Sequence, residues 1–535
     1  MASSFSHRSP LLRILQHSYH STIAFPSVGQ SGAKEFSEIL ELQNAGENQF
    51  RRAISRREFV KETASAFALG IGALSLPRLA RGANATPKIA IVGAGLAGLS
   101  TAYYLRRAGL PATLYEAANR IGGRVITLHD TFGSGLHTEL GGEFIDTHHD
   151  TMHELASHFD LALTSVKDPA LVDHAYFSGG RHYSEKEVVE CFRKIAPQIA
   201  KDRASLSTTN VLNEFESAKA FDNLSLAEYF DRLQLPTWFN RILSAAYTTE
   251  YGLDCGDQSS LNFIQVVKTD TGENRFDIFG DSDECCRIEG GNGRLTKTMA
   301  EDLHLQIETG MRLVRIAKKA STYHLTFEHS AAGTKMIEAD IVVMTLPFSV
   351  LRKLEMKMEL PASKHKAIQE LGYGTNAKLI TGFRSAPWRS GGFSGYTFTD
   401  EEYLTGWEAA HDPTTNASAF TMLLGGREGV NSNSGAPTEL ANRLLPGLDA
   451  AYTGSAASFT GIAERFHWPS NPYSLGCYSC YKPGQWTSIA GKEVETVGAL
   501  YFAGEHCGGD FQGFMEGAAL SGKNAALAIA KRIGK

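Results

Sequence analysis

The stretch KIAIVGAGLAGLSTAYYLRRAGLPATLYEA, residues 88–117, constrains the fold more than any other part of the chain. A short apolar strand leads directly into the pattern Gly93-x-Gly95-x-x-Gly98, and apolar residues at helical spacing follow it. A second strand, ATLYE, ends on Glu116, 23 residues after Gly93. A strand, a glycine-rich turn, a helix and an acidic residue at this distance predict a Rossmann-type dinucleotide-binding unit.

Each part of this unit has a physical task. Gly93 permits the tight turn, Gly95 lets the backbone approach a pyrophosphate, and Gly98 lets the helix pack on the strand. The free N–H groups at the start of the helix, at Leu96 and Ala97, bind the anion together with the helix dipole. The carboxylate that ends the second strand can accept hydrogen bonds from a ribose hydroxyl group.

Two further glycine-containing loops help to separate FAD from NAD as the bound dinucleotide. ANRIGGRV ends at Val125 and places Arg124, which can clamp a pyrophosphate with two hydrogen bonds, just beyond the acidic residue. ELGGEFID, residues 139–146, is a second loop whose backbone can approach a ligand closely. A nicotinamide-dependent dehydrogenase would need neither loop, which favours FAD over NAD.

Length and charge narrow the remaining classes. At 535 residues the chain is long enough for two or more domains. The net charge is −6 and there is no long run of Lys and Arg, so nucleic acid is not an expected partner. Seven cysteines in a chain of this length do not make a disulfide scaffold.

Residues 1–85 are expected to lie outside the fold. SRREFVK at 55–61, the apolar stretch 64–76 and the small residues 83–85 follow the order of a signal peptide, and the paired arginines resemble a twin-arginine signal. Such a signal exports proteins already folded around a cofactor, which predicts a periplasmic or secreted protein. Residues 1–34 lack Asp and Glu, so organelle targeting is an alternative, although a start codon assigned too early explains the extra residues more simply.

Eight separated motifs make the chain similar to the flavin-dependent amine oxidase superfamily, which includes monoamine oxidases, polyamine oxidases, L-amino-acid oxidases and tryptophan 2-monooxygenases. The motifs are IVGAGLAGLSTAYYL, YEAANRIGGRV, ELGGEFID, IEGGNGRLTKTMA, ADIVVMTLPFSVL, YGTNAKLITGF, GCYSCYKPGQW and YFAGEHCGGDFQGFMEGAALSGKNAA. The resemblance implies an α/β fold in which a Rossmann-type FAD-binding domain is interleaved with an α+β substrate-binding domain. The FAD-binding domain would take residues 86–150, 285–350 and 465–535, and the substrate-binding domain residues 151–284 and 351–464.

Local patterns agree with this organisation. Ser184 and Glu187 form a predicted capping box at the start of an amphipathic helix, and Ser225 with Glu228 repeats the pattern. YHLTFEH and ADIVVMTL are predicted strands. The polar segment 425–439 is predicted to be a surface loop.

The resemblance also assigns cofactor contacts to residues at matching motif positions. Val314 would meet the adenine ring through its backbone, and Gly141 and Gly142 would lie under the flavin. Glu505 would bind toward the pyrophosphate and ribityl groups, and residues 512–515 would present N–H groups to the pyrimidine edge at the start of a helix. The expected cofactor-binding set is Gly93, Gly95, Leu96, Ala97, Gly98, Glu116, Ala117, Arg124, Gly141, Gly142, Glu143, Val314, Cys477, Glu505, Gln512, Gly513, Phe514 and Met515.

Three residues match catalytic positions of the family. Lys378, in GTNAKLI, matches the lysine that holds a water molecule near flavin N5. Tyr478 and Phe514 match two aromatic residues that face each other across the substrate amine. Monoamine oxidases have Tyr at both positions, so Phe514 keeps the aromatic face but lacks the hydroxyl group. An ordinary strand lysine and plain core packing are the alternatives, and Trp468 and Trp486 could line the same cavity.

The resemblance implies an FAD-dependent oxidase that removes a hydride from the amine-bearing carbon of a small or aromatic amine. The product is an imine, which water converts to an aldehyde and ammonia, while O2 reoxidises the flavin and yields hydrogen peroxide. The alternatives are an L-amino-acid oxidase, a tryptophan 2-monooxygenase and a dehydrogenase that passes electrons to a carrier protein. A non-enzymatic thiol or zinc module is a further alternative.

The residues after the ELG loop favour an amine over an amino acid. Amino-acid oxidases typically place an Arg there to pair with the substrate carboxylate, whereas this chain has GEFID at 142–146. Glu143 and Asp146 would repel a carboxylate and attract a second amine if they faced the pocket; a solvent-facing or paired carboxylate is the alternative. Arg287 or Arg384 could still serve an amino acid.

The C-x-x-C in GCYSCY is compatible with a zinc site, a redox pair or a disulfide. Zinc needs about four ligands, and the adjacent Cys285-Cys286 is the only other pair, so no metal site is expected. In an extended segment Cys477 and Cys480 lie about 10 Å apart on opposite sides, and Pro483-Gly484 argues against the helix that a redox pair would open.

The resemblance offers a different role for the first cysteine. Cys477 falls on the residue that monoamine oxidases bond to the flavin 8α-methyl group, and an unlinked thiol near the flavin is the alternative. Cys480 is expected to be a small packing residue. Mitochondrial monoamine oxidases also carry a C-terminal membrane helix, but this chain ends at Lys535 soon after its last predicted helix, so no stable membrane anchor is expected. A homodimer is compatible with the resemblance.

Overall fold

The computed structural model describes residues 86–172, 174–206, 211–272, 276–329 and 332–535. The predicted signal segment within residues 1–85 lies outside these ranges. Within the described residues, no helix combines the length and the apolarity that crossing a membrane requires.

The predicted dinucleotide unit forms the centre of a parallel sheet. It consists of β1 (Ile89–Val92), α4 (Leu96–Arg107) and β2 (Ala112–Tyr115). The sheet has the strand order β22 (Leu500–Phe502), β13 (Ile341–Met344), β1, β2, β9 (Ile307–Glu308). All its pairings are parallel, and β1 is buried along its whole length because both faces of the sheet are covered.

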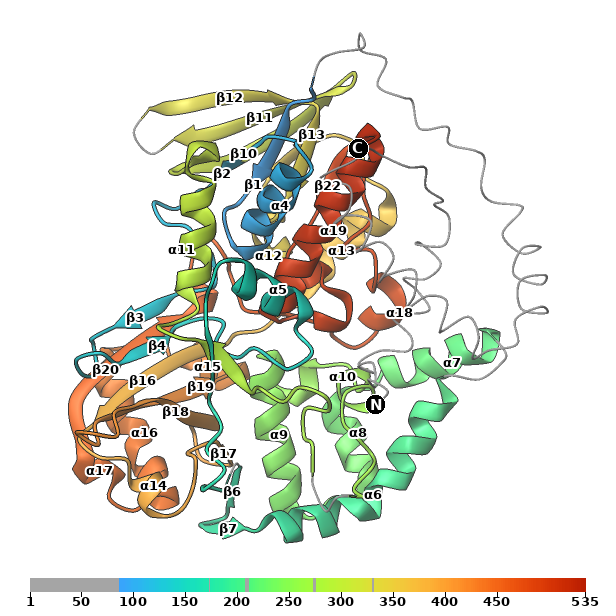
Figure 1. Ribbon diagram of the computed structural model, residues 1–535. Coiled ribbons are helices and arrows are strands. Elements are labelled where there is room, and N and C mark those ends of the chain that lie inside the picture. Colours follow the sequence, from blue (N-terminus) through green and yellow to red (C-terminus); the bar gives the residue numbers. More distant parts are fainter. Residues whose placement is uncertain (1–85, 173, 207–210, 273–275, 330–331) are drawn as a thin grey trace.

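The last helix of the chain packs against the first helix of the dinucleotide unit. In Figure 1 the red helix α19 (Met515–Ile533) lies beside the blue helix α4. The Ser100 hydroxyl donates a hydrogen bond of 2.7 Å to the Ala519 carbonyl. A Cβ atom at Gly522 would lie 2.4 Å from the Ala97 carbonyl oxygen, so the two helices meet at backbone distance. Distant parts of the chain therefore build one domain.

A second, smaller sheet packs on the parallel one. It contains β12 (Gly333–Ala339), β11 (Thr322–His329), β10 (Met311–Lys319) and β14 (Glu355–Lys357). The rings of Tyr115 in β2 and Phe327 in β11 lie 4.9 Å apart and join the two sheets. Strand β14 pairs with β10, and α13 (Ala362–Glu370) follows it in the chain.

A seven-stranded sheet dominates the lower left of Figure 1. Its order is β20 (Phe459–His467), β16 (Ala377–Phe383), β19 (Ser418–Leu424), β18 (Thr405–His411), β17 (Thr397–Thr399), β6 (Ala175–Ser178), β7 (Arg181–Tyr183). Side chains alternate between the two faces of a strand. Ala377 and Leu379 pack into the apolar cluster that includes α16 (Pro437–Ala451), whereas Ile380 packs into a different cluster beside β4 (His137–Glu139). Lys378 therefore points to the face opposite α16.

Helices fill the lower right of Figure 1. They are α6 (Glu185–Ser205), α7 (Val211–Asp222), α8 (Leu226–Leu233), α9 (Thr237–Tyr251) and α10 (Leu261–Ile264). Both predicted capping boxes are confirmed. The hydroxyl groups of Ser184 and Ser225 accept from the backbone N–H groups of Glu187 and Glu228. In return, each glutamate carboxylate accepts a hydrogen bond from the backbone N–H of its serine.

The prediction of a loop over 425–439 is wrong. Residues Gly426–Asn431 form helix α15, and α16 begins at Pro437. A Cβ atom at Gly429 would lie 2.1 Å from the Thr375 carbonyl oxygen, so the first helix packs closely on a distant segment. Tertiary packing thus imposes helix on a polar, glycine-rich sequence that has little helix propensity of its own.

Shorter elements connect these layers. They are α5 (Asp150–His158), α11 (Gly293–Asp302), α12 (Phe348–Leu351), α14 (Pro387–Ser390), α17 (Ser455–Ser458), α18 (Gln485–Ile489), the pairs β3 (Thr127–His129) with β4, β5 (Leu163–Ser165) with β8 (Cys286–Ile288) and β15 (Gly372–Tyr373) with β21 (Ser479–Cys480), and the 3-10 turns η1 (Cys255–Asp257), η2 (His304–Gln306), η3 (Trp468–Ser470), η4 (Glu505–Cys507) and η5 (Gly509–Phe511).

Candidate active site

A cavity of about 690 Å³ runs from the dinucleotide unit to the seven-stranded sheet. This volume lies in the range of small-molecule and cofactor sites. Most of the predicted cofactor residues line it, namely Gly93, Gly95, Leu96, Ala97, Glu116, Ala117, Arg124, Gly141, Gly142, Glu143, Val314, Cys477, Glu505, Gly513, Phe514 and Met515, and so do Lys378 and Tyr478. Gly98 and Gln512 lie outside the lining.

The glycine-rich turn has the geometry of an anion-binding cradle. Gly93 adopts φ +107°, which favours glycine, and its N–H donates to the Tyr115 carbonyl at 2.8 Å. A Cβ atom at Gly98 would lie 2.0 Å from the Gly93 carbonyl oxygen, so Gly98 serves helix packing. A Cβ atom at Gly95 would meet its nearest neighbour, Gly123, only at 3.7 Å. The first turn of α4 has no acidic residue and no side-chain cap, which leaves its N–H groups for a ligand.

Glu116 is already engaged by the backbone around it. Its two carboxylate oxygens accept from the N–H groups of Ala94 at 2.7 Å and Ala118 at 2.8 Å. Burial raises the pKa of Glu116, and these N–H groups oppose that shift. Each oxygen retains a further lone pair, so a ribose hydroxyl group can still donate to it.

The structure leaves the backbone of Val314 outside the strand pairing. The register between β10 and β11 skips from Leu313 to Arg315, which is a β-bulge at Val314. The neighbouring Met311 N–H donates to the Glu116 carbonyl at 2.7 Å, which brings β10 close to the end of β2. The bulge therefore offers backbone groups to an adenine ring at the position that the resemblance implies.

Arg124 and Glu505, predicted as separate cofactor contacts, form an ion pair. Arg124 Nη1 lies 3.0 Å from Glu505 Oε1. The Glu505 carboxylate also accepts from the Ser479 hydroxyl at 2.6 Å and the Gly513 N–H at 3.1 Å. Burial alone would raise the pKa of Glu505, but the charge of Arg124 holds it below its ordinary value. The pair fixes the Arg124 guanidinium at the cavity wall.

The segment 512–515 offers fewer N–H groups than predicted. The N–H of Gln512 donates to the Gly509 carbonyl, that of Gly513 to Glu505, and that of Phe514 to the Phe511 carbonyl. Met515 is the first residue of α19, so its N–H lies outside the helical hydrogen bonds. The helix start at Met515 is therefore the part of this segment that can serve a ligand.

Lys378 lies at the junction of the two parts of the molecule. Its ammonium donates to Glu143 Oε2 at 2.7 Å, the Gly141 carbonyl at 2.8 Å and the Glu139 carbonyl at 3.2 Å. These contacts use all three of its donors. A bound water, as the resemblance implies, would have to replace the longest of them, the contact with Glu139.

The cysteines of the C-x-x-C have different environments. Cys477 lines the cavity, and burial raises the pKa of its thiol to about 11 while nearby Arg124 opposes the shift. Cys480 is buried in β21, where its sulfur accepts from the Asn262 amide at 3.4 Å. Both are free thiols. The placement of Cys480 agrees with the predicted packing residue.

Aromatic side chains that the sequence did not single out form the far end of the cavity. Phe144, Phe279, Tyr396 and Trp407 line it together with Tyr478 and Phe514, and we call these six side chains the aromatic chamber. The Trp407 ring lies 5.3 Å from that of Phe144 and 5.7 Å from that of Tyr396. Phe144 could have been found because it directly follows the ELGGE motif, whereas Tyr396 and Trp407 carry no local signal.

The two tryptophans considered from the sequence differ in position. Trp468 lines the cavity and donates to the Leu140 carbonyl at 3.1 Å. Trp486 lies outside the lining, where it donates to Asn262 Oδ1 at 2.7 Å.

Glu143 and Asp146 do not present free carboxylates to the cavity, which removes the argument that they attract a second amine. Glu143 pairs with Lys378 at 2.7 Å and with Arg287 at 3.7 Å. Asp146 accepts from the Ser282 hydroxyl at 2.7 Å and the Glu284 N–H at 3.0 Å. Glu250 and Glu284 are two further acidic side chains of the cavity lining.

The protonation of Glu284 is perturbed by its surroundings. Burial, together with the charges of Glu250 and Asp146, raises the pKa of Glu284 to about 8. Arg287 and Arg384, considered as partners for a substrate carboxylate, lie outside the lining. The Arg287 guanidinium donates to the Ala409 carbonyl at 2.5 Å, and that of Arg384 to the Ala457 carbonyl at 3.2 Å.

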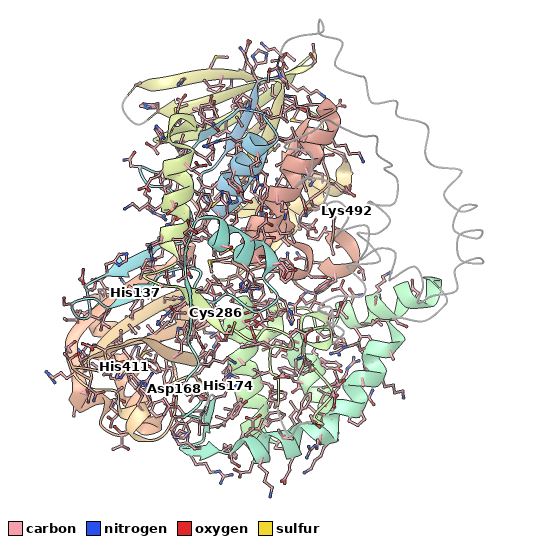
Figure 2. All side chains as sticks on the ribbon, viewed as in Figure 1. His137, Asp168, His174, Cys286, His411 and Lys492 are labelled. Carbon is pink, nitrogen blue, oxygen red and sulfur yellow. The ribbon has the colours of Figure 1, made fainter. Side chains whose placement is uncertain are left out.

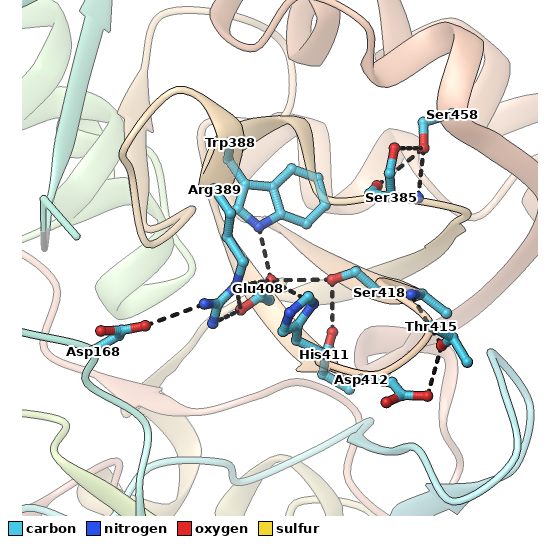
Figure 3. A network of polar contacts seen from close by, with 12 residues as sticks. Asp168, Ser385, Trp388, Arg389, Glu408, His411, Asp412, Thr415, Ser418 and Ser458 are labelled. Carbon is cyan, nitrogen blue, oxygen red and sulfur yellow. Dashed lines mark hydrogen bonds and ion pairs between the residues drawn. The ribbon is translucent and has the colours of Figure 1, made fainter. Parts of the chain in front are cut away.

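A small outer pocket adjoins the cavity and shares Phe144, Phe279, Glu284, Tyr396 and Trp407 with it. Figure 3 shows the polar network on its far wall, where Glu408 accepts from Arg389, Trp388 and Ser418. Arg389 also pairs with Asp168 at 3.2 Å. Figure 2 shows Asp168 and His174, which line the outer pocket, in the lower half of the molecule.

The residues at the dinucleotide end fit FAD. An uncapped helix start, a glycine turn with space above Gly95, a bulged backbone at Val314 and the Arg124 guanidinium all line one elongated cavity. The aromatic chamber at the opposite end leaves space for an apolar group of a substrate.

Comparison with known proteins gives the same result. The family model "Flavin containing amine oxidoreductase" matches residues 96–530. The flavin-containing amine oxidase of Oncorhynchus mykiss is 22% identical over 85% of this chain and 87% of its own length. The putative L-amino-acid oxidase YobN of Bacillus subtilis is 26% identical over 84% of this chain and 95% of its own length. The solved cyclohexylamine oxidase of Brevibacterium oxydans IH-35A superposes with a TM-score of 0.73 at 20% identity, over 84% of this chain and 100% of that chain. Because the family match spans most of the chain, the protein belongs to the flavin-containing amine oxidoreductase family.

Proposed function

We propose that the protein is an FAD-dependent oxidase of a small or aromatic amine. The observation that carries this proposal is the continuity of one cavity from the glycine-rich turn, past Lys378, to the aromatic chamber. When bound, the flavin accepts a hydride from the amine-bearing carbon and passes the electrons to O2, which gives hydrogen peroxide. The resulting imine reacts with water to give an aldehyde and ammonia.

The chain's own residues would orient the substrate and control its protonation. The aromatic chamber removes water from around the amine and disfavours its ammonium form, which cannot donate a hydride readily. Tyr478 and Phe514 supply opposing apolar walls in this proposal. The Lys378–Glu143 pair holds the loop of Gly141 and Gly142 in place at the chamber entrance.

The charges of the lining favour an amine over an amino acid. Glu250 and Glu284 are acidic and lie beside the chamber, and Lys378 is already paired with Glu143. The other cations of the lining, Arg120, Arg124, Arg312 and Lys353, come from segments that surround the dinucleotide unit. A substrate carboxylate in the chamber would therefore find no free arginine to pair with among the described residues, and Glu250 and Glu284 would offer it no positive charge.

Amino-acid oxidation is the second candidate, because one relative of similar length is called a putative L-amino-acid oxidase. A peroxidase-coupled assay of the purified holoprotein with matched pairs, such as an aromatic amine and its parent amino acid, separates the two. We expect peroxide from the amine. Peroxide from the amino acid alone would overturn the proposal, and flavin bleaching by the amine that persists in air would indicate a dehydrogenase instead of an oxidase.

We further propose that Cys477 binds the flavin covalently. Its thiol lies in the cavity lining beside Arg124, which supports this role. The test is acid precipitation, in which covalently bound flavin stays with the pellet. Cys477→Ala should move the yellow colour to the supernatant, whereas the matched variant Cys480→Ala should leave it in the pellet because Cys480 is buried away from the cavity. Colour in the supernatant of the unchanged protein would exclude the tether.

We also propose export by the twin-arginine-type signal around residues 55–85. Arg56→Lys together with Arg57→Lys should leave the protein inside a host that has this pathway. Recovery of the unchanged protein only in the host cytoplasm would contradict export.

A further inference from the structure

Two adjacent cysteines directly follow Glu284, which lines the cavity, and they take no part in the proposed reaction. Cys285 and Cys286 are free, partly exposed thiols, and their sulfurs lie 2.9 Å apart. Figure 2 shows Cys286 near the middle of the molecule. The adjacency that makes the pair unsuitable for zinc brings the two thiols into direct contact.

The backbone holds this pair on both sides. The Cys286 N–H donates to the Ile145 carbonyl at 3.1 Å, and the Ile145 N–H donates to the Cys286 carbonyl at 2.7 Å. The Val166 N–H donates to the Cys285 carbonyl at 2.9 Å. Two neighbouring segments therefore fix the backbone on both sides of the peptide that joins the cysteines.

We propose that Cys285 and Cys286 form a reversible redox site that hydrogen peroxide closes to a disulfide. One thiol reacts with peroxide to give a sulfenic acid and water, and the second thiol then displaces the hydroxyl group as a second water. Two thiols lose two electrons and two hydrogens in total, and one peroxide is reduced to two waters. The peroxide comes from the protein's own turnover, a source that rests on the proposed function.

The order of the two steps follows from the surroundings of the pair. Cys285 Sγ donates a hydrogen bond to the Ile145 carbonyl at 3.4 Å, which holds its proton, and burial raises the pKa of this thiol. The thiolate is the form that attacks peroxide. Cys286 is therefore the first thiol to react, and Cys285, in contact with it, resolves the sulfenic acid.

The disulfide should be easily reduced. Consecutive Cα atoms are about 3.8 Å apart, which is less than the roughly 4.4–6.8 Å that relaxed disulfides prefer. Strained disulfides are the labile and regulatory ones. Mild thiol treatment should thus restore both cysteines.

The redox site is coupled to the cavity through the residue before it. Glu284 lines the cavity, and its N–H donates to Asp146 at 3.0 Å. Cys285 Sγ donates to the Ile145 carbonyl at 3.4 Å and contacts Thr147 Oγ1 at 3.5 Å. Disulfide formation removes the proton that Cys285 Sγ donates to the Ile145 carbonyl, so this contact beside Glu284 is lost. We expect the KM for the amine to rise several-fold on oxidation.

Peptide mapping of the holoprotein tests the proposal without relying on activity. Trypsin releases residues 276–287 as one peptide that holds both cysteines, and residues 466–492 as another that holds Cys477 and Cys480. The protein is treated briefly with added peroxide, and its remaining thiols are then blocked with N-ethylmaleimide. Peptide 276–287 should then carry no N-ethylmaleimide, and its mass should be two hydrogens below that of the reduced peptide. Dithiothreitol should restore two blockable thiols. The Cys480 thiol should remain blockable throughout, as an internal control.

Variants test the order and the coupling. Cys285→Ser should leave a sulfenic acid on Cys286 that dimedone labels, and Cys286→Ser should abolish both the disulfide and the reversible rise in KM. The proposal would be overturned if Cys285 and Cys286 both still react fully with N-ethylmaleimide after a peroxide treatment that is strong enough to oxidise other thiols. Oxygen added to one cysteine of the unchanged protein, without disulfide, would also overturn it. A disulfide formed by added peroxide in a protein without amine turnover would support the redox site and contradict the proposed oxidase.

Discussion

The ammonium of Lys378 lies 2.7 Å from Oε2 of Glu143, although 235 residues separate them in the chain. Their side chains are only 8% and 2% exposed. This ion pair joins the seven-stranded sheet to the loop at the end of β4 and thus connects the substrate part with the dinucleotide part. Breaking it should affect both turnover and stability.

Lys378→Met should lower the rate of flavin reduction by an amine by about 100-fold, because the loop of Gly141 and Gly142 loses its anchor. It should also lower the free energy of unfolding by about 3 kcal/mol, because it leaves the buried Glu143 carboxylate with only the more distant Arg287 as a partner. Stopped-flow absorbance and urea denaturation measure the two effects. The double variant with Glu143→Gln should regain part of the lost stability. Purely additive losses would show that the pair is not coupled.

Two glycines of one motif should respond differently to alanine. Gly95→Ala should leave the stability of the apoprotein nearly unchanged, since its Cβ would have 3.7 Å of space, but should weaken FAD binding about tenfold by narrowing the cradle. Gly98→Ala should destabilise the apoprotein itself, since its Cβ would lie 2.0 Å from the Gly93 carbonyl oxygen. Thermal unfolding and flavin titration separate the two effects. Equal loss of stability in both variants would contradict this division of roles.

Glu284 should make stability depend on pH. Its folded-state pKa of about 8 lies above the ordinary glutamate value of 4.5, so between these values the folded protein binds a proton that the unfolded chain releases. Its contribution to the free energy of unfolding therefore falls as pH rises from about 5 to 8, by at most about 1.4 kcal/mol per pH unit. Glu284→Gln should flatten this slope in denaturation series at several pH values, whereas Glu190→Gln, on the exposed face of α6, should not. An unchanged slope in Glu284→Gln would show that the carboxyl ionises freely.

The network in Figure 3 should stabilise the fold without contributing to the chemistry. Glu408 is 9% exposed and accepts from Arg389, Trp388 and Ser418, so Glu408→Ala should cost about 2 kcal/mol by leaving buried donors unpaired. Glu402→Ala is the control, since Glu402 is 57% exposed and pairs only at the surface with Arg443, which contributes about 0–1 kcal/mol. Differential scanning calorimetry compares the two. Similar melting temperatures for both variants would refute the structural role.

Much of the candidate site could be predicted from the sequence, because its cofactor end is built from local motifs. The positions of Gly93, Gly95 and Glu116 follow from a strand, a turn and a helix that are contiguous in the chain. The aromatic chamber could not be predicted in the same way. Tyr396 precedes β17 and Trp407 lies within β18, and neither has a spacing that marks it as a ligand contact.

The sequence by itself determined the dinucleotide unit, the two capped helices and the family resemblance, because hydrogen bonding and side-chain periodicity within a few residues decide such features. Only the tertiary structure decided which charges pair. In the folded protein Glu143 forms ion pairs with Lys378 and Arg287, and Glu505 forms one with Arg124. Glu250 and Glu284, which the sequence did not single out, line the cavity beside the chamber. The energy of a charge depends on its burial and on its nearest partner, and here the partners are brought together by segments that lie hundreds of residues apart.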